Sequence, residues 1–194
     1  MKQLFLVSSF ADTYEQLPAF VGSDLTGQRV AFINTASLTE ERTSYVDKAF
    51  TALESLGLEV TLVNIYADEV TALIESSDMI YVAGGNTFYL LQELQKSGVD
   101  HLIKSHIDQG KVYIGESAGS IIMSPNIHYI KEMDDINEGP DLVDYTGFHV
   151  ISQSPLPHVG NKYLQEAVDV ILDKYQDSLD LHPFTDEEVF LIKE

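Results

Sequence analysis

Short apolar segments alternate with segments of helical periodicity along most of this sequence, and that alternation limits the possible folds more than any other feature. The strand-like runs are rich in β-branched and aromatic residues, and amphipathic stretches long enough to form helices separate them. This order builds β-α-β units, in which consecutive strands run parallel and helices cover both faces of the sheet. The sequence therefore predicts an α/β protein with a mostly parallel sheet.

The expected elements can be placed by residue range. Strands are predicted at 4–7, 29–34, 58–65, 79–83, 111–115 and 150–154, and helices at 68–76, 87–96, 99–109 and 161–175. One more helix is expected to open at the capping-box sequence Ser37-Leu38-Thr39-Glu40 and to end at Gly57. The segments Leu179–Phe184 and Val189–Lys193, separated by Thr-Asp-Glu-Glu, are expected to form a closing hairpin, and 123–147 is expected to form loops and short elements.

Length and composition narrow the class of protein. The 194 residues, 44% of them hydrophobic, suit one globular domain over 1–194, with no repeat or interdomain linker. A net charge of −20 argues against nucleic acid and anionic membranes as partners. No apolar run approaches the roughly 20 residues of a membrane span, and the N-terminus resembles a first strand more than a signal peptide, so a cytoplasmic location is expected.

Ser117 stands where a buried strand is about to turn. The sequence Gly115-Glu116-Ser117-Ala118-Gly119 fits the G-x-S-x-G nucleophile elbow, with a strand before it and an apolar helical stretch after it. Small flanking residues allow the sharp turn, and the N–H of Ala118 would then point toward the same space as the serine, where it can hold an oxyanion. The alternative is that Ser117 is only a small residue that lets the backbone bend.

A second glycine-rich turn follows the preceding strand. Gly84-Gly85-Asn86-Thr87 should reach the same carboxyl edge of a parallel sheet, and its unobstructed N–H groups suit a second oxyanion donor. It also fits a plain strand-to-helix turn capped by Asn86 or Thr87. No Gly-Lys-Ser/Thr or G-x-G-x-x-G pattern completes a phosphate site, and no cofactor is predicted.

A nucleophilic serine needs a base and a carboxylate that orients it. Among six histidines, His158 is favoured because it follows a strand in a loop stiffened by two prolines, and His128 is the alternative. The segment Lys131–Asp135 offers three carboxylates, Glu132, Asp134 and Asp135. His128 and Glu132 lack further ligands at metal-binding spacing, so no metal site is predicted. The absence of cysteine excludes disulfides and a thiol nucleophile.

Taken together, these motifs resemble peptidase family S51, the dipeptidase E or α-aspartyl dipeptidase group of serine peptidases. The resemblance runs from about Met79 to Val159 and is carried by Gly84-Gly-Asn-Thr87, by the elbow after Val112-Tyr-Ile114, and by Pro157-His158. It implies a class I glutamine-amidotransferase-like (flavodoxin-like) three-layer α/β sandwich. It also implies catalysis through a covalent acyl-enzyme.

The resemblance gives each motif a role. Ser117 is expected to be the nucleophile, His158 the general base, and Gly85 and Ala118 the donors of the oxyanion hole. The family has Asp directly before Met, and counting from the elbow without gaps reaches Glu132-Met133, fifteen residues after Ser117. A Ser-His-Glu triad with Glu132 is therefore expected, with Asp134 and Asp135 as alternatives.

The expected substrate is a short peptide, with N-terminal Asp-X as the candidate that the resemblance suggests. Aspartyl specificity needs a cation near the substrate carboxylate, yet the two arginines, Arg29 and Arg42, lie far from the motifs in sequence; Lys131, His128 or Lys162 are the substitutes. The rival functions are a small-molecule esterase built on the same elbow and an inactive ligand-binding homologue. Apolar helix faces suit either the core or a homodimer interface.

Overall fold

A six-stranded sheet forms the centre of the computed structural model, which describes all 194 residues. Its strand order is β3-β2-β4-β5-β1-β8. The strands are β1 (Gln3–Val7), β2 (Arg29–Ile33), β3 (Glu59–Leu62), β4 (Met79–Val82), β5 (Val112–Glu116) and β8 (Val189–Lys193). All neighbours pair in parallel except β8, which runs antiparallel to β1 at one edge. The predicted mostly parallel sheet is confirmed.

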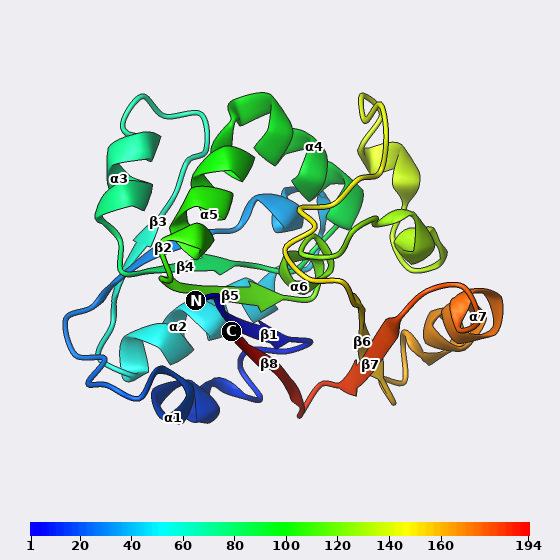
Figure 1. The fold of residues 1–194 in the computed structure, drawn as a ribbon, viewed down its shortest axis with the longest axis horizontal. Helices are drawn as coiled ribbons and strands as arrows, with labels where there is room; N and C mark the ends of the chain where they lie inside the picture. The colour runs from blue at the N-terminus through cyan, green and yellow to red at the C-terminus, as the bar shows by residue number, and fades with distance from the viewer.

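Helices cover both faces of this sheet, as Figure 1 shows with the sheet almost edge-on. One face carries α3 (Val70–Ser76), α4 (Thr87–Ser97) and α5 (Val99–Asp108), and the other carries α1 (Leu17–Val21) and α2 (Ser44–Ser55). The two chain ends meet near the middle of the molecule, where Lys2 and Glu194 exchange backbone hydrogen bonds. The helices lack the combination of length and apolar composition that a membrane span requires.

The alternation of side chains along each strand explains why both faces need cover. In β1, Leu4 and Leu6 point into the core beneath α3, α4 and α5, whereas Phe5 and Val7 point into the core beneath α1 and α2. All four are fully buried. Because successive residues of a strand face opposite sides, a continuous apolar run is stable only in a strand that is covered twice.

A separate two-stranded sheet lies beyond the carboxyl end of the main sheet. It consists of β6 (Ser154–Val159) and β7 (Leu181–Thr185), which pair in parallel around α7 (Gln165–Tyr175). The predicted closing hairpin is therefore wrong. Its first strand, β7, pairs with β6, and its second strand, β8, joins the main sheet beside β1. The strand predicted at 150–154 is also misplaced, because β6 begins only at Ser154.

Several other elements begin or end at residues that differ from the predicted ones. The helix expected to open at Ser37 begins at Ser44, and Thr35–Thr39 forms a short 3-10 helix, η2, instead. The N-terminal region contains α1 and the preceding 3-10 turn η1 (Tyr14–Gln16), which the sequence pattern did not indicate. The expected loops after Met123 contain two more 3-10 turns, η3 (His128–Glu132) and η4 (Ile136–Glu138).

Truncating Leu6 should destabilise the protein more than any surface truncation. Leu6 is 0% exposed in a strand with neighbours on both sides, so Leu6→Ala should lower the free energy of unfolding by about 2–5 kcal/mol. Leu38→Ala, at a position that is 63% exposed, is the matched control and should change it by less than about 0.5 kcal/mol. Urea unfolding monitored by circular dichroism measures both, and equal losses would contradict the described core.

Candidate active site

Ser117 occupies the single residue between β5 and the short helix α6 (Ala118–Ile121). Its backbone has φ 47° and ψ −104°, a conformation that side-chain-bearing residues rarely adopt. The Ser117 N–H donates to the Val7 carbonyl at 2.8 Å, which fixes the turn to the end of β1. The strained turn therefore projects the serine from the carboxyl edge of the sheet, as the elbow motif predicts.

The neighbouring small residues are required by close backbone approach. A Cβ on Gly115 would overlap the Gly119 carbonyl, and a Cβ on Gly119 would overlap the Val82 carbonyl of β4. Ser120 then locks the turn, because its hydroxyl lies 2.7 Å from the Gly115 carbonyl oxygen and 3.1 Å from the Val7 N–H, which it accepts. The elbow is thus held by the strands on both sides of β5.

His158 meets this serine from the second sheet. Its Nε2 lies 2.9 Å from Ser117 Oγ. The pairing of β6 with β7 shifts by one residue between Leu156 and Val159, and within this bulge His158 has φ 70°. A bulge redirects a side chain, which here points the imidazole out of the small sheet. The His158 N–H donates to Ser8 Oγ at 3.0 Å, so the loop after β1 also holds the histidine.

Asp186 supplies the carboxylate that contacts this histidine. It follows the last residue of β7, and its Oδ1 lies 2.8 Å from His158 Nδ1. Its other oxygen accepts a hydrogen bond from the Asn161 side chain at 2.7 Å. The hydrogen bond with His158 is the main cause of a lowered pKa for Asp186, which keeps this carboxyl ionised. An ionised acceptor holds the imidazole with its proton on Nδ1 and its lone pair toward Ser117.

The three acids expected for this position lie elsewhere. Glu132 pairs with Lys174 of α7 at 2.9 Å, which corrects the expected Ser-His-Glu132 arrangement. Asp134 accepts a hydrogen bond from the Thr87 N–H at 2.9 Å, and Asp135 caps η4 through the Asn137 N–H. The count from the elbow failed because η3, which ends at Glu132, packs against α7, and Asp134 after it is held at the start of α4 by the Thr87 N–H.

Two backbone amides close to Ser117 in the chain or at the cavity wall, those of Gly85 and Ala118, are the expected oxyanion-hole donors. The Gly84 N–H lies 3.5 Å from a carboxylate oxygen of Glu116, and the Asn86 N–H donates to the Ala36 carbonyl at 3.0 Å. The Gly85 N–H between them has no acceptor in the protein. Gly85 has φ 131°, and a Cβ there would overlap the Ala36 carbonyl, so only glycine fits. The second amide is that of Ala118, the first residue of α6.

Glu116 lies beneath the site and is 3% exposed. Its Oε1 accepts a hydrogen bond from the Phe10 N–H at 2.8 Å, and its Oε2 accepts one from the Tyr81 hydroxyl at 2.6 Å. Burial is the main cause of a raised pKa for this carboxyl. Glu116 therefore ties the loop after β1, strand β4 and the Gly84–Gly85 turn to the elbow.

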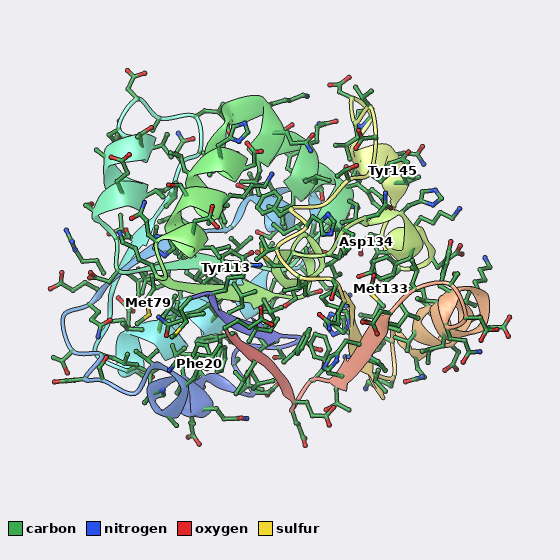
Figure 2. All side chains as sticks on the ribbon, in the orientation of Figure 1. Phe20, Met79, Tyr113, Met133, Asp134 and Tyr145 are labelled. Atoms are coloured by element: carbon green, nitrogen blue, oxygen red, sulfur yellow. The ribbon has the colours of Figure 1, made fainter.

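These groups surround a cavity of about 460 Å³ at the carboxyl edge of the main sheet. Its walls comprise Ser8, Ser9, Asp12, Glu40, Tyr45, Gly84, Gly85, Glu116, Ser117, Met133, Asp134, His158, Asn161, Leu164 and Asp186. Figure 2 labels Met133 and Asp134 on the side of the molecule where β6, β7 and α7 lie. The volume suits a small molecule or a short peptide.

The cations and the second histidine considered from sequence are outside this cavity. The ring of His128 packs against Tyr145, with centroids 5.0 Å apart, and Lys131 Nζ lies 3.5 Å from the same histidine. The Lys162 ammonium lies over the Tyr163 ring at 4.6 Å. Arg29 is next to Asp78 at the opposite end of β2. None of these side chains lines the cavity.

Asp186 and Asn161 are the site residues that sequence reasoning missed. Thr185-Asp186-Glu187-Glu188 has the composition of a hairpin turn, and Asp186 was assigned to that turn. A parallel pairing of Leu181–Thr185 with the strand that carries His158 would have brought Asp186 to the histidine, since parallel strands end at the same edge. The apolar pattern of a strand does not reveal its partner.

A serine stands at a sharp turn at the carboxyl edge of a parallel α/β sheet; a histidine contacts this serine, and a carboxylate contacts the histidine. This arrangement defines a serine-type hydrolase. The model of the family described as peptidase family S51 matches residues 4–194. The chain belongs to this family of serine-type peptidases, as its motifs indicated.

Related proteins agree with that membership. An uncharacterized peptidase of Listeria monocytogenes is 43% identical over 196 residues, which cover 100% of this chain and 95% of that protein. A peptidase E of Salmonella newport is 35% identical over 145 residues, 73% of this chain and 60% of that protein. A crystal structure of a Listeria monocytogenes protein described as a peptidase E superposes with a TM-score of 0.93 at 44% identity, over 99% of this chain and 94% of that one. The expected class I glutamine-amidotransferase-like fold is confirmed.

Asp134 should make stability depend on pH in a defined direction. Burial raises its pKa to about 6 from an ordinary value of 3.8, so the folded protein holds this proton more tightly than the unfolded chain. The stabilising contribution is complete below pH 3.8 and is lost as the pH rises through 6. Asp134→Asn should therefore exceed wild type in unfolding free energy by about 1–3 kcal/mol at pH 8, and by less at pH 5.

Urea unfolding at the two pH values measures this difference, and Glu41→Gln, at an exposed neighbour of the cavity, is the control for loss of one negative charge. A gap that widens toward pH 5 would contradict the burial of Asp134.

Proposed function

We propose that this protein is a dipeptidase that hydrolyses short peptides through a Ser117-His158-Asp186 triad. The single observation that carries the proposal is the continuous chain of short contacts, 2.9 Å from Ser117 Oγ to His158 Nε2 and 2.8 Å from His158 Nδ1 to Asp186 Oδ1. Distances in this range allow direct proton transfer between hydroxyl and imidazole. The cavity volume of about 460 Å³ suits a short substrate better than an extended polypeptide.

Acylation begins when the Ser117 hydroxyl attacks the peptide carbonyl carbon. His158 Nε2 accepts the hydroxyl proton as the C–O bond forms, and Asp186 stabilises the resulting imidazolium. The negative charge moves to the carbonyl oxygen, where the N–H groups of Gly85 and Ala118 hold it. The free Gly85 N–H is suited to this task because no protein acceptor competes for it.

The C–N bond then breaks, and His158 returns its proton to the leaving amine. The product is an ester between Ser117 and the N-terminal part of the substrate. A water molecule, deprotonated by His158, attacks this ester and restores the free serine. Asn161 assists by holding the second oxygen of Asp186, which fixes the carboxylate plane relative to the imidazole.

A substrate panel tests the proposed class of reaction. Purified protein is incubated with unblocked dipeptides, a tripeptide, a longer peptide and short-chain esters, and products are separated by liquid chromatography. The expected result is turnover of dipeptides and its abolition in Ser117→Ala. Ester hydrolysis with no peptide hydrolysis would favour the esterase alternative, and activity that survives Ser117→Ala would refute the proposed nucleophile.

Substitution of the two competing acids tests the triad itself. Asp186→Asn should lower kcat by about 10³–10⁴-fold, because an amide neither orients the required tautomer nor stabilises the imidazolium. Glu132→Gln should stay within about twofold of wild type, since Glu132 pairs with Lys174 on the surface. Steady-state kinetics on one dipeptide gives both values. The reverse pattern would restore Glu132 as the acid.

A further inference from the structure

The walls of the active-site cavity carry five carboxylates and no lysine or arginine. They come from five different segments: Asp12 after β1, Glu40 after η2, Glu116 at the end of β5, Asp134 after η3 and Asp186 after β7. Because all of these segments end at the same edge of the molecule, their charges converge on the space in front of Ser117. His158 is the only wall residue that can carry a positive charge.

Two of the five carboxylates are fully engaged with the protein. Asp186 uses one oxygen for His158 and the other for Asn161, and Glu116 uses its oxygens for Phe10 and Tyr81. All four oxygens of these two groups are therefore already hydrogen-bonded within the protein, and neither group is the main candidate for contact with a ligand.

Glu40 and Asp134 are only half engaged. Glu40 Oε2 accepts the Tyr45 hydroxyl at 2.6 Å, and Asp134 Oδ2 accepts the Thr87 N–H at 2.9 Å. The second oxygen of each carboxylate has no hydrogen-bond partner in the protein. Tyr45 and Thr87 therefore hold two carboxylates in fixed positions while each leaves one oxygen for a cationic ligand.

No positive side chain neutralises this pair. Lys131, Lys162 and Lys174 contact His128, Tyr163 and Glu132, respectively, outside the cavity. Arg42 lies two residues after Glu40, is exposed and does not line the cavity. A substrate carboxylate placed beside Glu40 and Asp134 would be repelled by their charges, whereas an ammonium group would be attracted.

We propose that Glu40 and Asp134 bind the ammonium group of a free N-terminus, and that the enzyme selects peptides whose first side chain is uncharged or basic and discriminates against N-terminal aspartate. This inference rests on the proposed peptidase function and narrows it. Glu40 and Asp134 act as specificity-determining residues in front of the triad. The net negative field of the cavity sets the preference for the first side chain.

Two matched substrate pairs test the inference on the wild-type protein. Asn-Leu and Asp-Leu have nearly the same shape and differ by one negative charge, so kcat/KM should be at least about tenfold higher for Asn-Leu. Ala-Leu and N-acetyl-Ala-Leu differ in the presence of the ammonium group, and the acetylated peptide should be a poor substrate by a similar factor. Most of each difference should appear in KM, because binding is what changes.

Substitutions then assign the effect to the two carboxylates. Glu40→Gln and Asp134→Asn should each raise KM for Ala-Leu by about five- to tenfold with a smaller change in kcat, and should narrow the Asn-Leu to Asp-Leu ratio. Glu41→Gln removes the same charge next to the cavity but outside its walls, and it should leave both values within about twofold. Equal effects of the three substitutions would overturn the assignment.

Binding to Ser117→Ala separates failure of the inference from failure of the proposed reaction. Calorimetry with Asn-Leu, Asp-Leu and N-acetyl-Ala-Leu reports affinity whether or not the wild type cleaves peptides. Tighter binding of Asn-Leu than of the other two supports the inference even if only esters are hydrolysed. Tighter binding or faster turnover of Asp-Leu overturns it, and absence of any peptide binding also overturns it.

Discussion

Parallel strand pairing brings the whole site together. Each parallel strand ends at the same edge, so Glu116 of β5, the Gly84–Gly85 turn after β4 and the loop after β1 all arrive within reach of one another. The second, smaller sheet repeats the arrangement, since β6 and β7 also run parallel and deliver His158 and Asp186 to neighbouring positions. The geometry of the site follows from the direction of the strands before any side-chain chemistry is considered.

Much of the main sheet and part of the site could be predicted from the sequence. Ser117, His158 and the glycine turn lie in short motifs that can be recognised in the sequence: glycines on both sides of the serine, a glycine pair after a strand, and a histidine beside a proline. The order of strands and α-helices from β2 to β5 also follows from periodicity. The motifs are short enough to be identified directly, and the order of elements follows from one repeated β-α-β unit.

Asp186 could not be found in the same way. The position of Asp186 depends on the partner of Leu181–Thr185. This segment could pair with β6, which precedes it, or with β8, which follows it, and both pairings satisfy the same apolar pattern. Nearby strands separated by polar residues usually form a hairpin, and here the chain instead passes from one sheet to the other. A motif count from the elbow then led to Glu132, which the fold directs toward α7.

The acidic side chains that line the cavity lower the stability of the folded protein where they are buried. Burial raises the pKa values of Glu116 and Asp134, so each ionised carboxylate opposes folding at neutral pH. Hydrogen bonds offset part of that cost: both carboxylate oxygens of Glu116 accept one, and one oxygen of Asp134 does. Asp134 thus lowers stability at neutral pH and, in the proposed mechanism, also contributes to substrate preference.

The bulge in β6 turns His158 toward a serine that belongs to a different sheet. Ser117 stands on the large sheet, whereas His158 and Asp186 stand together on the small one. The contact between His158 and Asp186 therefore lies within the small sheet, whereas the contact between Ser117 and His158 joins the two sheets. Packing and the hydrogen bond from His158 N–H to Ser8 also hold the two sheets together. In the proposed mechanism the proton passes from Ser117 to His158 across the boundary between the two sheets.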